Sequence, residues 1–322
     1  MTQLDRLVRL ARKGTSLEDL CNRMDLSPRR VSYLLKEAKA EGMAVELVGG
    51  VVALHPSGPA ADVARVSMDV ASAEHPHRFA VISDLHFGSK YHLRDQLKDF
   101  IHLAYKKGCR NIFIPGDLTD GCYRHGRWEL THHGFQDQAE DFIKGLPEHR
   151  GLHYTAITGN HDQTFEDSSG IVVHKALEDM FRSAGRRDVD ILGARGAYVR
   201  LRAKGERRGL LVELWHPFKG PAYALSYKLQ KKVEGYSVGM KPDAVFTGHW
   251  HQQCYCVVRG VHAFSSGTFQ GGGSAFGKAL GGSPSIGGWI IEYALTKDGT
   301  VRELTPTWVS YYERETAREV SI

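Results

Sequence analysis

The sequence lacks a long hydrophobic run and any Cys-x-x-Cys pair. No stretch reaches the roughly 18 consecutive apolar residues that a membrane-spanning helix needs, so we expect no membrane partner. The start of the chain also lacks the apolar segment of a secretory signal. The five cysteines are odd in number, which argues against a disulfide framework or a thiolate zinc site. We therefore expect a cytoplasmic protein with reduced thiols.

Neither sign of charge dominates the composition. The 42 Lys and Arg against 37 Asp and Glu give a formal charge of +5, which is compatible with an anionic partner without requiring one. A content of 42% hydrophobic and 25% charged residues is typical of a globular protein. With 322 residues, the chain can form one large domain and one small domain, each with its own core. The sequence does not predict the oligomeric state.

The first 56 residues have the pattern of three short helices followed by a β-hairpin. Apolar residues recur at helical spacing in 3–12, 17–21 and 28–41. Ser27 suits the N-cap of the third helix, and Pro28 suits its first position. Two apolar runs on either side of Gly49-Gly50 predict the hairpin.

This order of elements resembles the winged helix-turn-helix family over about residues 3–55. The resemblance implies that Arg29 and Arg30, at the start of the third helix, contact nucleic acid. Residues 5–41 contain nine Lys or Arg against six Asp or Glu, and this local net of +3 favours phosphate contacts. The alternatives are a protein-interaction module and a basic helix face that is only solvated. The pattern does not choose among DNA, RNA and protein as the partner.

We expect residues 1–56 to form this domain, 57–77 a linker and 78–322 a second domain. The linker is inferred from its Pro, Gly and small residues, and it is compatible with a short helix near Ala61 to Val70. In the second domain, strands expected at 79–83, 111–114 and 154–158 alternate with helices at 93–107 and 135–146. Repeated β-α-β units of this kind predict a parallel α/β sheet.

The second half of this domain changes in character. It has two helical patterns, at 174–184 and 226–236, and a strand-like run at 244–247. Alternating apolar residues predict hairpins over 197–215, 255–264 and 289–309. The glycine-rich segment 267–288 predicts a mobile loop near the site, and a lid over substrate is one role open to it.

Polar side chains follow the predicted strands at the points where they end. The carboxyl ends of strands in an α/β sheet meet at one edge, where ligands bind. Imidazole and carboxylate ligands without thiolate suit Mn²⁺, Fe or Zn²⁺. The residues that follow the strands in this way are Asp84, His86, Asp117, Asn160, His161, His216, His249 and His251.

These residues form five ordered motifs that resemble those of the calcineurin-like metallophosphoesterase superfamily over roughly residues 79–270. The resemblance implies two facing β-sheets flanked by helices, and a centre with two divalent metal ions, Mn²⁺ first and Fe or Zn²⁺ as alternatives. The motifs are Asp84-x-His86, Gly116-Asp117-x-x-Asp120, Gly159-Asn160-His161-Asp162, His216 and Gly248-His249-x-His251.

The resemblance also implies a role for each residue. His161 would face the phosphate as the catalytic group, and Asp162 would orient it. Asp117 would bridge the two metal ions. One metal would be held by Asp84, His86 and His251, and the other by Asn160, His216 and His249.

Three functions are compatible with these features. We predict a metal-dependent phosphoesterase, with a phosphodiesterase or nuclease acting on nucleic acid recruited by the N-terminal domain as the first hypothesis. The segment 84–88 is similar to the opening motif of the family's DNA-repair nucleases, although we expect the C-terminal capping region of those enzymes to be lacking. The second hypothesis is a phosphatase of phosphoproteins or small phosphate esters. The third is a DNA-binding regulator with a vestigial phosphoesterase domain.

Overall fold

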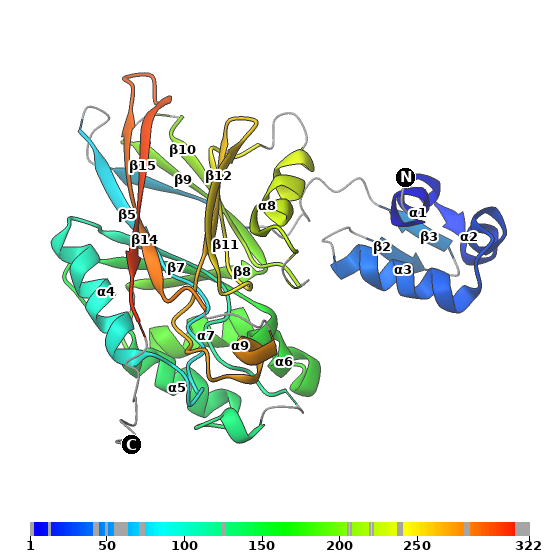
Figure 1. Ribbon diagram of the computed structural model, residues 1–322, viewed down its shortest axis with the longest axis horizontal. Helices are drawn as coiled ribbons and strands as arrows, with labels where there is room; N and C mark the ends of the chain where they lie inside the picture. Colours follow the sequence, from blue (N-terminus) through cyan, green and yellow to red (C-terminus); the bar gives the residue numbers. More distant parts are fainter. Residues whose placement is uncertain are drawn as a thin grey trace, which may run out of the picture. The chain divides into compact units, whose positions relative to one another are not determined.

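The computed structural model describes residues 3–11, 14–40, 45–48, 51–54, 64–70, 75–123, 127–204, 206, 208–218, 220, 222–236, 241–279 and 284–312. The chain divides into two compact units (Figure 1). The smaller unit contains the elements from α1 to β3, and the larger contains those from β4 to β15. In the described part of the chain, every helix is too short or too polar to cross a bilayer.

The smaller unit consists of three helices and a three-stranded antiparallel sheet in the order β1-β3-β2. The helices are α1 (Gln3–Ala11), α2 (Leu17–Met24) and α3 (Pro28–Ala40). The strands are β1 (Thr15–Ser16), β2 (Val45–Val48) and β3 (Val51–Leu54). The three helices and the hairpin predicted from the sequence are therefore confirmed as elements.

Two serines define where helices of this unit begin. Ser16 Oγ accepts a hydrogen bond from the main-chain N–H of Asp19 at 3.0 Å, and Ser27 Oγ accepts one from that of Arg30 at 3.3 Å. Each bond satisfies a donor that the first helical turn leaves free. Arg29 and Arg30 are exposed on the first turn of α3. The core of the unit is formed by Leu7, Ala11, Leu20, Met24, Val31, Leu34, Leu35 and Val52.

The larger unit contains two mixed six-stranded sheets. The first has the order β15-β14-β5-β6-β7-β8, and the second has the order β12-β13-β11-β10-β9-β4. The strands of the first sheet are β5 (His77–Val81), β6 (Asn111–Pro115), β7 (His153–Thr158), β8 (Val189–Ala194), β14 (Gly287–Leu295) and β15 (Val301–Ser310). Those of the second are β4 (Ala64–Val70), β9 (Gly196–Ala203), β10 (Leu210–Trp215), β11 (Ala244–Thr247), β12 (Gln253–Val258) and β13 (Val261–Ser266).

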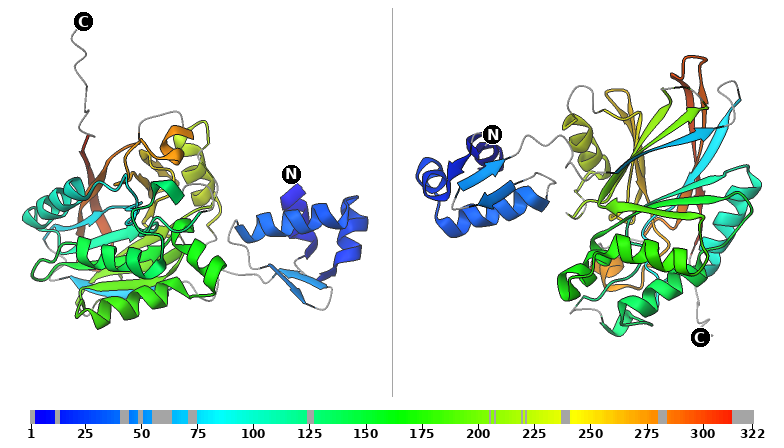
Figure 2. Two further views of the ribbon diagram at one scale, coloured as in Figure 1. Left: turned by 90° about the horizontal axis from the view of Figure 1, so that it is seen from below. Right: turned by 180° about the vertical axis from the view of Figure 1, so that it is seen from behind.

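Helices cover the outer face of each sheet, as Figure 1 and Figure 2 show. Buried residues of α4, α5 and α7 pack on the first sheet, and those of α8 pack on the second. The helices of this unit are α4 (Arg94–Lys106), α5 (Phe135–Gly145), α6 (Asn160–Ser169), α7 (Val173–Ser183), α8 (Leu225–Glu234) and α9 (Ala275–Ala279). The predicted α/β fold with two facing sheets and flanking helices is confirmed, but the first sheet is mixed rather than parallel, because β14 pairs antiparallel with both β5 and β15.

Strand β5 shows why its sequence is apolar at consecutive positions. Phe79 and Val81 point into the core between the two sheets, whereas Ala80 and the following Ile82 point into the core under the helices. Side chains alternate between the two faces of a strand, and here both faces are buried. The three predicted hairpins are confirmed by the antiparallel pairs β9 with β10, β12 with β13 and β14 with β15.

Strand β4 corrects the expectation of a short helix near Ala61 to Val70. Residues Ala64–Val70 instead pair in parallel with β9 at the edge of the second sheet. The side chains of Val66 and Met68 pack against the core between the sheets, and Ser67 between them is exposed. This alternation has the period of a strand, which the small and polar composition of the surrounding segment concealed. The remainder of the expected linker, apart from 75–77, lies outside the described residues.

Candidate metal centre

The seven residues expected to bind metal are brought together by the structure. Asp84 and His86 follow β5, Asp117 follows β6, and Asn160 begins α6 directly after β7. The second sheet supplies the remaining three, because His216 follows β10, and His249 and His251 follow β11. Potential ligand atoms lie within 4.8 Å of one another in three overlapping groups, which are Asp84, His86, His251; Asp117, His216, His249; and His86, Asp117, His161.

Five of these residues have a left-handed backbone conformation. The φ angle is 51° at Asp84 and at His86, 50° at Asp117, 82° at His249 and 52° at His251. A residue with a Cβ atom pays about 1–3 kcal/mol to adopt such a conformation, so it persists only where the surroundings impose it. The concentration of this strain after three strands indicates a functional site.

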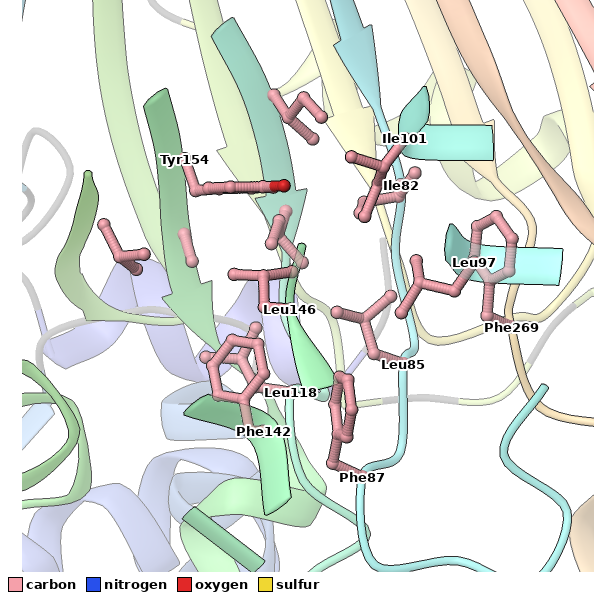
Figure 3. Packing of buried hydrophobic residues seen from close by; sticks show 14 of the residues in the cluster. Ile82, Leu85, Phe87, Leu97, Ile101, Leu118, Phe142, Leu146, Tyr154 and Phe269 are labelled. Atoms are coloured by element: carbon pink, nitrogen blue, oxygen red, sulfur yellow. The ribbon is translucent and has the colours of Figure 1, made fainter. Parts of the chain in front are cut away.

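Apolar side chains beside the strained residues hold their loops against the core. Leu85, Phe87 and Leu118 are fully buried in the cluster under the helices (Figure 3). The two loops are also joined through the main chain, because the N–H groups of Leu85 and His86 both donate to the carbonyl of Asp117, at 2.8 and 3.1 Å. Loops fixed in this way present Asp84, His86 and Asp117 in one defined geometry.

Glycines in the motifs allow the loops to approach one another closely. A Cβ atom at Gly159 would lie 2.2 Å from Asp117 Oδ1, and one at Gly116 would lie 2.2 Å from His216 Nδ1. Gly116 also has a φ angle of 98°, which favours glycine. Larger residues at either position would displace a potential ligand.

The first group is centred on His86 and His251. Their Nε2 atoms lie 3.1 Å apart, and His251 Nε2 is 3.3 Å from Asp84 Oδ1. His86 Nδ1 lies 2.9 Å from Asp120 Oδ1, so the carboxylate of Asp120 fixes the ring and leaves Nε2 as the atom available for a ligand bond. Ring nitrogens of metal-binding histidines are usually fixed from behind in this manner.

The amide oxygen of Asn160 adds a further potential ligand to the second group, which contains Asp117, His216 and His249. Asn160 Oδ1 is 2.9 Å from His216 Nε2 and 2.7 Å from His249 Nδ1. Asp117 Oδ2 is 3.2 Å from His216 Nε2 and 3.9 Å from His86 Nε2, so this one oxygen faces both groups. His216 Nδ1 is held by the carbonyl of Pro115 at 2.7 Å.

Electrostatics give Asp117 and His249 the protonation states that suit metal binding, whereas His216 keeps a proton that a bound metal ion would have to displace. Burial would raise the pKa of Asp117, but the imidazoles of His216 and His161 hold it well below its usual range. Burial would lower the pKa of His216, whereas the Asp117 carboxylate raises it to about 9. Burial and the neighbouring His216 lower the pKa of His249 to about 3. An ionised carboxylate and a neutral imidazole are the forms that bind a cation.

The donor atoms of the two groups fit divalent metal ions. They are nitrogen and carboxylate or amide oxygen, all are largely buried, and none is a thiolate. Such a set of ligands suits a catalytic site for Mn²⁺, Fe or Zn²⁺ better than it suits a structural zinc site. Asp120 and Pro115 supply the supporting contacts that orient the histidines.

The carboxylate of Asp162 is bound by groups other than the His161 ring, and its expected role in orienting His161 stays a prediction. The carboxylate of Asp162 accepts hydrogen bonds from the N–H groups of Gly159, Leu118 and Thr119 and from the Thr119 hydroxyl, at 2.7–3.1 Å. It therefore caps α6 and ties this helix to the loop after β6. His161 Nδ1 is instead held by the carbonyl of Asp120 at 2.7 Å.

A pocket of about 330 Å³ opens at the two groups. It is also lined by residues to which the sequence assigned no role, including Tyr123, Gln270 and Phe276. Gln270 Nε2 donates to Asp120 Oδ1 at 3.0 Å. The second motif already included Asp120, but no sequence signal predicted that Tyr123 or Phe276 would lie in the same pocket.

The described residues of the segment 267–288, which are 267–279 and 284–288, contain more secondary structure than the predicted loop. It contains α9, and its residues Thr268 and Gln270 form isolated bridges with Ile286 and His92. Phe276 on α9 places its ring 4.8 Å from that of His251. The segment therefore contributes to the wall of the pocket. The mobility of this segment and its role as a lid stay predictions.

Comparison with known proteins identifies a matching family and a curated relative. The family model of calcineurin-like phosphoesterases matches residues 77–253. The chain is 24% identical over 226 residues to the DNA polymerase II small subunit of Methanothermobacter thermautotrophicus, which covers 59% of this chain and 47% of the relative. The chain thus spans about half the length of this curated relative.

Solved structures that are similar to this chain include an archaeal phosphodiesterase, at 14% identity and a TM-score of 0.38 over 72% of this chain and 99% of that chain. They also include GAP50, the anchor in the inner membrane complex of Plasmodium, at 13% identity and a TM-score of 0.42 over 73% of this chain and 84% of that chain. The family match covers more than half of the chain and all five strand-end motifs. Because divalent metals are the cofactors of that family, the buried His and Asp cluster is its candidate metal site. The chain belongs to the calcineurin-like phosphoesterase family.

Proposed function

We propose that the chain is a phosphodiesterase that depends on two divalent metal ions and acts on nucleic acid. The position of Asp117 between the two groups of potential ligands is the observation that carries the two-metal proposal. In this proposal one ion is held by Asp84, His86 and His251. The other is held by Asn160, His216 and His249, and Asp117 contributes to both.

Mn²⁺ is the first choice of metal for this set of ligands, and Fe or Zn²⁺ is the alternative. Bound metal ions would lower the pKa of a water molecule toward neutrality and offset the negative charge of a phosphate group. The protein supports this chemistry by burying Asp84 and Asp117 and by fixing the rings of His86 and His216 from behind.

His161 is proposed to be the catalytic residue that handles a proton. Its Nδ1 is held by the Asp120 carbonyl, which leaves Nε2 for the pocket that the ring lines. Burial would lower the pKa of His161, but the carboxylates of Asp117 and Asp120 raise it. A protonated Nε2 can donate to the leaving oxygen as the phosphoester bond breaks. The main chain of His161 is fixed as well, by donation to Asp117 Oδ1 at 2.9 Å.

Two observations support nucleic acid as the substrate class. The smaller unit has three helices and a hairpin with Arg29 and Arg30 exposed, as a winged helix-turn-helix domain within residues 1–56 would have. The curated relative is named as a subunit of a DNA polymerase. We propose that this unit recruits DNA to the metal centre. The second domain is then proposed to begin at β4 rather than at residue 78.

One experiment distinguishes the three hypotheses. The full chain is loaded with Mn²⁺ and offered linear DNA, RNA, bis-p-nitrophenyl phosphate and p-nitrophenyl phosphate in parallel. We expect cleavage of the diesters and of nucleic acid. Cleavage of the monoester alone would replace the nuclease by a phosphatase. Cleavage of none, with metal bound, would favour a DNA-binding regulator with a vestigial centre.

A further inference from the structure

Two aromatic side chains line the pocket beside the candidate metal centre. Tyr123 lies in the loop after β6, and Phe276 lies on α9. Neither ring belongs to the set of proposed metal ligands, and both are partly accessible, with Tyr123 38% exposed and Phe276 half-buried. The question is therefore what function two uncharged aromatic faces have beside a phosphoesterase site.

The two rings are the ends of a row of ring contacts. Tyr123 is 4.7 Å from His161 between ring centroids, His161 is 4.5 Å from His86, and His86 is 5.0 Å from His251. His251 is in turn 4.8 Å from Phe276. The imidazoles of the centre therefore lie between Tyr123 and Phe276 along this row. A phosphate bound at the centre would have one aromatic ring in each direction.

The chemistry of the lining favours a diester that carries planar groups. A phosphodiester has two substituents, one on each side of the scissile phosphorus, so it can use both rings. Among the described residues that line the pocket there is no Lys or Arg, the side chains that commonly pair with a terminal phosphate dianion. Stacking of a nucleobase on an aromatic side chain contributes about 1–3 kcal/mol and is tolerant of sequence.

We infer that Tyr123 and Phe276 stack on the nucleobases that flank the scissile phosphate, so that the site takes single-stranded nucleic acid with little sequence preference. This inference rests on the nuclease function proposed above. Bases in a duplex are already stacked on one another and are not free to meet the two rings. The substrate would be a single strand or a locally unpaired region.

The test compares two oligonucleotides that contain one cleavable linkage each. All linkages except the central phosphodiester are methylphosphonates, and in one oligonucleotide the residues on both sides of that linkage are abasic. We expect the Mn²⁺-loaded full chain to cleave the oligonucleotide with bases at least about tenfold more efficiently, as kcat/KM. A duplex of the same sequence should be cleaved more slowly than the single strand.

Phe276 is the position to vary, because the Tyr123 hydroxyl also contacts Asn160. Phe276→Leu removes the aromatic face but keeps apolar bulk, and it should bring the ratio between the two oligonucleotides to within about threefold. Phe276→Trp should keep or increase the ratio, which provides a second reading if the leucine variant folds poorly. Tyr227→Leu is the matched control, since Tyr227 is an exposed aromatic on α8 outside the pocket lining. Metal content is measured for every variant.

The outcomes separate this inference from the nuclease proposal. Equal cleavage of the two oligonucleotides, or a wild-type ratio in Phe276→Leu, overturns the stacking role and leaves a nuclease. Cleavage of duplex as fast as single strand also overturns it. If the wild-type protein cleaves bis-p-nitrophenyl phosphate but neither oligonucleotide, the nuclease function itself is wrong and the inference is overturned with it.

Discussion

Tyr123 and Asn160 are joined by two hydrogen bonds that run in opposite directions. Asn160 Nδ2 donates to the Tyr123 hydroxyl at 2.8 Å, and that hydroxyl donates to the main-chain oxygen of Asn160 at 3.2 Å. With Nδ2 engaged in this way, Oδ1 is turned toward His216 and His249. Tyr123 thus selects which end of the amide is presented to a metal ion.

The variant Tyr123→Phe should weaken metal binding. It leaves the ring in place but removes the partner of Nδ2, so the amide is free to rotate. Loss of such a supporting contact typically lowers metal affinity by about 10–100-fold. Titration calorimetry with Mn²⁺ measures the change, with Tyr227→Phe as the matched control. An affinity within twofold of the wild type would show that the hydroxyl does not position Asn160.

Replacing the proposed proton donor should separate catalysis from metal binding. In His161→Ala we expect both metal ions to remain bound and kcat for linear DNA, whose alkoxide leaving group needs a proton, to fall by about 10²–10⁴-fold, which is the usual contribution of general acid catalysis. Elemental analysis and steady-state kinetics on the same sample provide the comparison. A parallel loss of metal and activity would instead make His161 a ligand, as its place in the third group of potential ligands allows.

Folding stability should depend on pH through His92. Burial lowers the pKa of His92 to about 4, even though Nδ1 donates to the Leu85 carbonyl at 2.6 Å. Between pH 6.5 and pH 4 the unfolded chain therefore binds a proton that the folded chain does not. The free energy of unfolding should fall as the pH falls through this window, by up to about 3 kcal/mol from this residue.

The variant His92→Asn keeps a donor near the position of Nδ1 but cannot titrate. Urea unfolding of both proteins at several pH values, with EDTA present so that metal release does not contribute, measures the two slopes. We expect a shallower dependence on pH in the variant, whatever its stability at pH 7. Identical slopes would show that His92 is not the source of the effect.

Binding of DNA should depend on Arg29 and Arg30. The double variant Arg29→Ala/Arg30→Ala should bind DNA more weakly at all sequences and reduce the slope of log affinity against log salt by about 2, one for each lost phosphate contact. Fluorescence anisotropy at several salt concentrations measures both quantities. Arg302→Ala, an exposed position on β15, serves as the control. An unchanged salt slope would favour a protein-interaction role for the smaller unit.

The ends of the strands could be predicted from the sequence because each apolar run is followed by polar residues. The run that ends at Ile82 is apolar at consecutive positions because its two faces meet two different cores. A segment buried on both sides in this way is distinctive even without knowledge of its neighbours. The polar residues after such a run then point to the edge of the sheet.

Contacts between loops could not be predicted in the same way. Asp162 follows His161 directly, yet its carboxylate binds Thr119 and Leu118 in another loop, because a residue at the third position of a helix points back to the helix start. Helix α6 itself was missed, since its sequence has little helical periodicity and begins with an Asn that reads as a turn. Phe276 reaches His251 only through the path of a glycine-rich segment, which carries no periodic signal.

The burial of Leu85, Phe87 and Leu118 has a consequence for genetics. These residues carry no functional group, but they determine the position of the loops on which Asp84, His86 and Asp117 lie. A screen for inactive alleles that still yield folded protein would therefore recover substitutions at the three apolar positions together with those at the polar ones. Substitutions that preserve activity must therefore keep the shape of the hydrophobic core under these loops, just as they must keep the potential metal ligands on the loops.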